Sequence, residues 1–519
     1  MPIDLLPLLA PGGLAVAAAI RFLTPGARPL AQPWLAEAMA LLALLVAAAT
    51  AALVALGGAH TFGLVGPLGI GLSLRLDAVS AVMFLLVAFV GWIVLRYTRT
   101  YLKGEPRQGP FTGWICLTLA AVMLLVTAGN LVQLLAAWVA TSLFLHELLL
   151  FYRERPAAQR AARKKFVMAR LGDAALLGAV ILLTVAYGTT DIATILADAR
   201  AGEGGAVAVV AAGFLAVAAL LKSAQFPTHG WLTEVMETPT PVSALLHAGV
   251  VNAGGFLLIR FADVMLLAPG ILAVLVILGG FTALFGCLVM LTQPAVKTSL
   301  AWSTVGQMGF MVLQCGLALF PLALLHIVAH SLYKAHAFLV SGSAIETIAA
   351  NRRPGPVAIP GPLAVGRAFL VALAIYAVTA LAFGIDGKSP QALALGAILI
   401  LGIAYLFAQG FADAAPRALT RRTAVYAAAA SVSYFALQSA ATWLTAGTLP
   451  ATPAPGPLEW ELIVLAVLSF GIVAVAQSMF PLWSNHPAAA GLRVHLSNGL
   501  YANALLDRAL RGWSVRGAT

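Results

Sequence analysis

The sequence predicts an all-α fold, a polytopic bundle of about 13 to 15 transmembrane helices in which some helices are broken. Of its 519 residues, 61% are hydrophobic and only 9% are charged, whereas a soluble domain carries about 25% charged residues. The mean hydropathy is correspondingly high at +0.96. Because the long Ala, Leu and Val runs lack the alternation of barrel strands, we expect helices to satisfy the backbone in lipid.

Fifteen apolar segments have lengths near the roughly 20 residues that a helix needs to cross a bilayer. We expect helices at 5–22, 35–56, 77–97, 111–129, 131–152, 167–187, 206–225, 240–262, 270–291, 298–319, 321–348, 363–384, 391–411, 423–446 and 459–480. Gly129-Asn130 predicts a tight turn between the fourth and fifth segments. Pro227, Pro239 and Pro241 interrupt the backbone around the seventh and eighth segments, because proline has no N–H group to continue a helix.

The basic residues lie mainly in short loops on one side of the predicted bundle. The formal net charge of +11 therefore follows the positive-inside pattern of membrane proteins rather than that of a nucleic-acid-binding surface. Arg99 and Lys103 lie in one such loop, and we interpret 153–165 as a second loop with six basic residues. The opposite loops contain little beyond Arg75, Arg200 and Lys388. This pattern predicts a multi-pass protein of the inner (cytoplasmic) membrane, with its N-terminus outside and its C-terminus in the cytoplasm.

The predicted helices divide the chain into four regions. N-terminal transmembrane helices occupy 1–110, a core that carries most of the intramembrane ionisable residues occupies 111–348, and C-terminal transmembrane helices occupy 349–486. The remaining segment, 487–519, is expected to be cytoplasmic. Within it, residues 492–513 interleave arginines with leucines, which is typical of an amphipathic helix that lies on the membrane or on a partner.

Three ionisable side chains are spaced four residues apart in the eleventh segment: His326, His330 and Lys334. This spacing places them on one face of a helix, about 6 Å apart along its axis. Since neutral histidine can both accept and donate a proton, the stripe is predicted to relay protons. Two other interpretations are a polar contact between helices and a zinc site, although no third His, Cys or acidic ligand accompanies the histidine pair.

Lys222 closes the seventh apolar segment and is followed by the helix-breaking Pro227. A lysine within the membrane is costly unless it is partnered, and broken helices that carry ionisable groups are the usual architecture of transport sites. His247 follows the second interruption, at Pro239 and Pro241. We therefore predict that Lys222 and His247 belong to a transport path. The alternative is that Lys222 extends to the membrane surface.

The fifth and sixth segments also contain ionisable residues. His146 and Glu147 form an adjacent acid–base pair, and Asp173 follows Arg170 by three positions. These groups are either counter-charges for Lys222 or anchors near the loops.

We expect neither an enzyme active site nor a metal site in this chain. The sequence has no Gly-rich phosphate loop, nucleophile elbow or paired-carboxylate signature. The cysteines Cys116, Cys287 and Cys315 have no metal-ligand spacing and are interpreted as buried thiols.

Four long motifs between 206 and 346 resemble the antiporter-like subunits of respiratory complex I, Mrp-type cation/proton antiporters and related hydrogenases. The motifs are Lys222-Ser-Ala-Gln-Phe-Pro, Glu237-Thr-Pro-Thr-Pro-Val-Ser-Ala-Leu-Leu-His247, Lys297-Thr-Ser-Leu-Ala-Trp-Ser and His330-Ser-Leu-Tyr-Lys334. The resemblance implies the antiporter-like fold, with 111–348 as a proton-translocation core and a hydrated ionisable path across the membrane. Matched residue by residue, the path contains Lys222, His247, His326, His330 and Lys334, with Lys297 as a further member.

One position departs from the pattern of these subunits. They usually place a glutamate directly after the tryptophan of the fifth helix, but here Val139 follows Trp138. His146 and Glu147 lie two turns further on and near the same helix face. The resemblance therefore implies that the carboxylate partner of Lys222 is missing or displaced toward the cytoplasm.

The stretch from His247 to Arg260, together with the lack of a long lateral C-terminal helix, most resembles the DabB family. These are the membrane subunits of DAB inorganic-carbon accumulation systems. The resemblance implies a DabA-like partner, a cytoplasmic zinc protein related to β-carbonic anhydrases, and no cofactor in this chain. In this interpretation, the proton-motive force drives hydration of CO2 to bicarbonate in the partner. The alternatives are a proton-pumping subunit of an NADH–quinone oxidoreductase-like complex, a Na⁺/H⁺ antiporter subunit, and a membrane anchor with an inert polar path.

Overall fold

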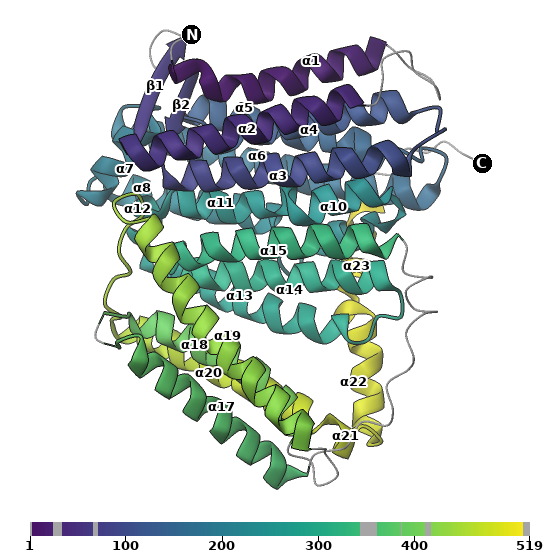
Figure 1. The fold of residues 1–519 in the computed structure, drawn as a ribbon, viewed down its shortest axis with the longest axis vertical. Coiled ribbons are helices and arrows are strands. Elements are labelled where there is room, and N and C mark those ends of the chain that lie inside the picture. Colours follow the sequence, from purple (N-terminus) through teal and green to yellow (C-terminus); the bar gives the residue numbers. More distant parts are fainter. Residues whose placement is uncertain are drawn as a thin grey trace.

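The computed structural model describes residues 3–23, 34–65, 71–342, 361–385, 387–410 and 417–511. Within these ranges, twelve helices are long and apolar enough to cross a membrane. They stack side by side in a layered, helical array (Figure 1). The predicted all-α, polytopic fold is confirmed.

The main helices follow the predicted segments closely. They are α1 (Leu9–Leu23, preceded by the 3-10 turn Ile3–Leu8), α2 (Trp34–Gly57), α3 (Ala78–Tyr101), α4 (Gln108–Val126), α5 (Leu131–Leu149), α6 (Pro156–Tyr187), α8 (Gly205–Lys222), α10 (Thr240–Ala248) with α11 (Ala253–Arg260), α13 (Pro269–Met290), α14 (Val296–Gly316), α15 (Phe320–Ser341), α17 (Pro362–Ala382), α18 (Pro390–Gly410), α19 (Arg417–Leu444) and α20 (Pro457–Ser478). Helices α17 to α20 form a tilted group beside the main layers (Figure 1). Parts of some expectations, such as 343–348 of the eleventh segment and 512–519 of the C-terminal segment, lie outside the described residues.

Small residues bring α13 and α14 into backbone contact. A Cβ atom placed on Gly309 would lie 2.4 Å from the backbone nitrogen of Ala283, and one on Gly279 would lie 2.5 Å from that of Leu313. Both distances are too short for any side chain. Glycine at such positions allows close helix approach in lipid, where no hydrophobic force drives helices together.

Helix α6 begins at Pro156 rather than at 167, so the segment 153–165 is mostly helical and not a loop. Proline suits the first helical turn, because its missing N–H group would be unpaired there in any case. Two basic residues of this segment lie buried within the helix. Lys164 and Lys165 are only 2% and 5% exposed, so they are buried side chains of a helix and not solvated loop charges.

Several short elements lie outside the fifteen predicted transmembrane segments. They are the hairpin β1 (His60–Val65) and β2 (Leu72–Leu76), together with α7 (Ile192–Arg200), α9 (Gly230–Thr233), α12 (Ala262–Leu266), α21 (Phe480–Trp483), α22 (Pro487–Ser497) and α23 (Ala502–Arg511). Of these, only the region of α22 and α23 was expected, as an amphipathic segment. The hairpin and α7 lie at one end of the bundle, whereas α22 and α23 cross the other end (Figure 1). We call the end with the α5–α6 turn, α22 and α23 the basic end.

The cysteines differ in exposure. Cys116 and Cys315 are buried, as expected, but Cys287 is exposed, so the expectation that all three cysteines are buried is wrong for Cys287.

An ion network closes the end opposite the basic end. Asp77 caps α3, and its Oδ1 accepts a hydrogen bond of 2.9 Å from the Ser80 N–H group. Arg260, at the end of α11, donates to both oxygens of this carboxylate at 2.5 and 3.1 Å. Arg75 of β2 donates to Oδ2 at 2.9 Å. Burial alone raises the pKa of Asp77, but the guanidinium groups of Arg260 and Arg75 outweigh it and lower the pKa to about 2.

At the basic end, α23 docks against its own chain. The Lys164 Nζ atom lies 2.6 Å from Glu234 Oε1 and 2.7 Å from Asp507 Oδ1. Asn503 Nδ2 donates to the same Glu234 oxygen at 2.8 Å. The predicted amphipathic helix is therefore present, but its polar face contacts α6 and the turn before α10, while Leu505 remains 65% exposed.

Candidate functional site

Lys222 lies at the C-terminal end of α8, where the chain leaves the helix before Pro227. The predicted break is therefore present, and the prolines at 239 and 241 mark the start of α10. Lys222 is 8% exposed, and its Nζ atom lies 4.3 Å from the ring centroid of Trp138 on α5. Among the described residues, Nζ forms no hydrogen bond and no ion pair within 4 Å. The ammonium is thus held against an aromatic face inside the protein, and the structure does not place it at the surface.

The carboxylate that acts on Lys222 belongs to α6 and not to α5. Asp173 interacts electrostatically with Lys222 and pairs with Arg170 Nη2 at 2.6 Å. Glu147 instead forms a 2.8 Å ion pair with the exposed Arg153. The ion pair of Glu147 agrees with the loop-anchor interpretation, and the role of Asp173 as a counter-charge for Lys222 stays a prediction.

Two separate hydrogen bonds join the end of α8 and the middle of α15 to a second break. The break lies between α10 and α11, where the 3-10 turn η3 (Val250–Asn252) replaces continuous helix. Ser223 Oγ donates to the carbonyl of Val251 at 3.0 Å, and Asn252 Nδ2 donates to Ser331 Oγ at 2.8 Å. The neighbours of Lys222 and His330 in the chain are thus linked through η3. This break was not predicted, because Gly249 interrupts the helix without any proline nearby.

The predicted histidine stripe and His247 lie together on α15 and α10. The rings of His326 and His330 are 6.1 Å apart between centroids, too far for a direct hydrogen bond. His330 interacts electrostatically with His326, His247 and Lys334. Both ring nitrogens of His247 and of His330 are buried without a hydrogen-bond partner among the described residues. Four ionisable groups from two helices therefore share one buried region.

Lys334 connects this group to α14. Its Nζ atom donates to Ser303 Oγ at 2.7 Å and to the Leu300 carbonyl at 3.4 Å. Lys297 lies in the first turn of α14, one turn before Leu300, and is partly exposed. It therefore lies nearer the membrane surface than Lys334 and has no described contact with the histidines.

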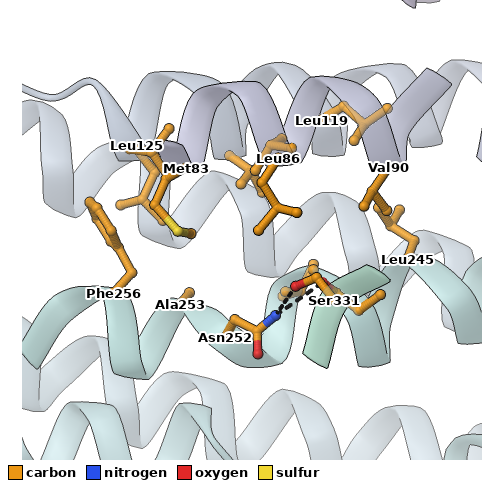
Figure 2. A pocket seen from close by; sticks show the side chains of 16 residues that line it. Met83, Leu86, Val90, Leu119, Leu125, Leu245, Asn252, Ala253, Phe256 and Ser331 are labelled. Atoms are coloured by element: carbon orange, nitrogen blue, oxygen red, sulfur yellow. Dashed lines mark hydrogen bonds between the residues drawn. The ribbon is translucent and has the colours of Figure 1, made fainter. Parts of the chain in front are cut away.

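A small cavity of about 30 Å³ lies between α3, α4 and the broken pair α10–α11. Its upper wall is apolar, and Asn252 and Ser331 form a polar floor (Figure 2). Asn252 Oδ1 has no hydrogen-bond partner among the described residues. A buried water needs about 10–15 Å³ and polar partners, so within this cavity water fits at the floor formed by Asn252 and Ser331.

Lys165 is the functional candidate that sequence reasoning missed. Its Nζ atom donates to the carbonyl of Ser142 at 2.5 Å and lies 3.1 Å from the Ser142 hydroxyl. It lines a cavity of about 20 Å³ with Lys222, Trp138 and Trp231. The signal was present in the sequence, since Asp173 follows Lys165 by eight residues and so lies near the same helix face, but the assigned loop concealed it. Within the described ranges, no group of three or more His, Cys, Asp or Glu side chains could hold a metal ion.

Two protein-family models match this chain. The model described as NADH:quinone oxidoreductase/Mrp antiporter, transmembrane, matches residues 128–355, and these residues contain the whole buried ionisable group. The model described as NADH-ubiquinone oxidoreductase (complex I), chain 5 N-terminus, matches residues 63–112.

Individual proteins are similar over longer ranges. A protein of Halothiobacillus neapolitanus, named probable inorganic carbon transporter subunit DabB2, is 39% identical over 462 residues, which are 86% of this chain and 82% of that protein. The DabB protein of Hydrogenovibrio crunogenus is 45% identical over 281 residues, which are 54% of each chain. Among solved structures, a chain of the Mrp complex from Dietzia sp. has a TM-score of 0.65 at 24% identity, and the match covers 99% of this chain and 59% of that one. At this identity the structural match shows a shared fold.

Proposed function

This chain belongs to the DabB family of antiporter-like membrane subunits, and from this premise we propose that it conducts protons and couples the proton-motive force to inorganic-carbon accumulation. Hydration of CO2 to bicarbonate takes place in a cytoplasmic, zinc-binding subunit related to carbonic anhydrases. The names of the relatives support the transport of inorganic carbon by a multi-subunit complex.

The observation that carries the proposal is the buried ionisable group itself. Ser223, which follows Lys222, and Ser331, which follows His330, each form a hydrogen bond at the break between α10 and α11. Ionisable groups inside a membrane are costly and mark proton or ion pathways. Here they occupy three helices and meet at a break that frees backbone carbonyls, as in transport sites.

The chemistry of these side chains favours protons over Na⁺ as the conducted ion. Lysine ammonium groups are donors without an acceptor, so they cannot ligate a metal cation. Hard cations need oxygen ligands, and Asp173, the carboxylate that acts on Lys222, is already paired with Arg170. Imidazole and amine groups, by contrast, gain and lose protons in turn.

Uptake measurements test this proposal directly. Cells without their own carbonic anhydrase, expressing this chain with its cytoplasmic partner, are expected to accumulate radiolabelled inorganic carbon. A protonophore should abolish the accumulation, and replacement of Na⁺ by K⁺ should leave it unchanged. Accumulation that persists with the protonophore but requires Na⁺ would contradict proton coupling.

The histidine stripe provides a more specific prediction in the same assay. His326→Gln with His330→Gln should lower uptake by about 10- to 100-fold, because glutamine keeps a donor and an acceptor but does not carry a proton as imidazole does. If the stripe only holds helices together, the glutamine variants should be nearly normal, and His330→Leu should reduce the amount of assembled complex instead. His60→Gln, at an exposed position on β1, serves as the matched control. Near-normal uptake by the double variant would defeat the relay.

We also propose that the protein lies in the inner (cytoplasmic) membrane. Its basic end then faces the cytoplasm, and its N-terminus lies outside. The basic residues of 153–165 and the docked α23 lie at this end. A cysteine introduced at Gln159, in the first turn of α6, should resist impermeant thiol reagents in intact cells and react after permeabilisation. A cysteine at Glu203, at the opposite end, should react in intact cells. The reverse result would invert the orientation.

A further inference from the structure

Lys165 is a buried cation without a carboxylate partner. It is 5% exposed, and among the described residues no acidic oxygen lies within 4 Å of its Nζ atom. Its hydrogen-bond acceptors are the Ser142 carbonyl and hydroxyl on α5. Burying a charged lysine within the membrane without a counter-ion costs free energy, and ionisable groups at such positions usually have a function. A structural role alone therefore explains Lys165 poorly.

Lys165 lines the inner of two cavities that α5 and α6 border. The inner one, of about 20 Å³, also contains Lys222 and Trp138. The outer one, of about 410 Å³, opens at the basic end and is lined by His146, Gln159, Arg163 and Phe166. His146 is one turn after Ser142 on the same face of α5, and it interacts electrostatically with Lys165. Its Nδ1 atom is buried without a hydrogen-bond partner among the described residues.

We propose that Lys165 relays protons between His146, at the open cavity of the basic end, and Lys222 in the interior. This inference rests on the proposed proton conduction and identifies its entry. The outer cavity brings water to His146, the imidazole passes a proton to Lys165, and Lys165 exchanges it with Lys222. No net bond change occurs, because each amine or imidazole accepts one proton and releases one.

The charges around Lys165 favour this exchange. The groups that act on it are Lys222 on α8, His146 on α5, and Arg170 and Asp173 on α6. Two ammonium groups in one small cavity repel each other, so the pair favours a state in which one proton is released. Asp173 compensates a single positive charge, and it already contacts Arg170. The arrangement therefore favours transfer of a proton between the two lysines over permanent charge on both.

The test uses the full chain, purified with its cytoplasmic partner and reconstituted in liposomes, with proton flux reported by an entrapped pH dye under a potassium diffusion potential. Lys165→Gln keeps a donor for Ser142 but cannot release a proton, and it is expected to slow the flux at least about 10-fold. Lys165→His, which can relay protons, should recover a large part of the rate. Lys103→Gln, an exposed lysine at the same end, should match the wild-type flux. Each rate is divided by the amount of folded protein measured by size exclusion.

A second variant keeps the test decisive if Lys165→Gln folds poorly. His146→Gln should also slow the flux, and the double variant should be no slower than the slower single variant, since both residues act in series. Wild-type flux in Lys165→Gln overturns the relay but leaves proton conduction intact. Equal loss in the Gln and His variants overturns it in favour of a structural role. No flux in the wild-type complex overturns the proposed function and the relay together.

Discussion

Replacement of Lys222 with alanine should abolish inorganic-carbon accumulation, a loss of about 100-fold or more, while the protein remains at its normal level in the membrane. Lys222 is the buried lysine at the end of α8, next to the hydrogen bond that joins Ser223 to the break between α10 and α11. Alanine removes both its charge and its proton. The loss should be measured as radiolabelled carbon uptake, normalised to the assembled complex.

Lys222→Arg separates proton transfer from fixed charge. Arginine preserves a cation over the Trp138 ring, but its guanidinium group does not release a proton in proteins. A relay therefore predicts that the arginine variant is as inactive as the alanine variant. Lys388→Arg is the matched control, because Lys388 Nζ also lies over an aromatic ring, 5.3 Å from the Phe435 centroid, outside the ionisable group. Normal uptake by Lys222→Arg would show that this lysine acts only through its charge.

Asp77→Asn is expected to lower the free energy of unfolding by about 3–5 kcal/mol, because it leaves a buried arginine without its counter-ion. Asparagine keeps the shape and an acceptor for the Ser80 N–H group. Arg260, however, is 3% exposed and has no other ion-pair partner among the described residues. The change should appear as a lower midpoint of thermal unfolding in detergent, followed by size exclusion.

The stability that the Asp77 ion network contributes should decrease only at low pH. Because the pKa of Asp77 is lowered from 3.8 to about 2, its stabilising effect is complete above pH 3.8 and is lost as the pH falls through about 2. The difference between Asp77→Asn and the wild type should therefore be the same at pH 7 and pH 5. Glu203→Gln, at an exposed carboxylate of the same end, should leave the midpoint unchanged. Equal midpoints for the two variants would show that the ion network contributes no stability.

The transmembrane helices were predictable from the sequence because each one is specified locally. In lipid, a segment must satisfy its own backbone hydrogen bonds, so about 20 apolar residues suffice to identify a helix. The break after Lys222 followed in the same way from Pro227, which has no N–H group. The stripe of His326, His330 and Lys334 needed only the helical period. The hairpin β1–β2 was missed because short strands between apolar segments have the composition of a loop.

Only the tertiary structure decided which charges meet. Asp77 and Arg260 are 183 positions apart, and their contact depends on how α3 and α11 pack. Asp173 on α6 interacts electrostatically with Lys222, whereas the sequence left residues of the fifth and sixth segments as equal candidates. Lys165 belongs to the interior because α6 extends beyond the apolar run and packs beneath α5. Hydropathy measures the free-energy cost of placing each side chain in lipid. Inside the protein, partners from other helices lower that cost. Because these partners come from distant parts of the chain, only the packing of the helices identifies them.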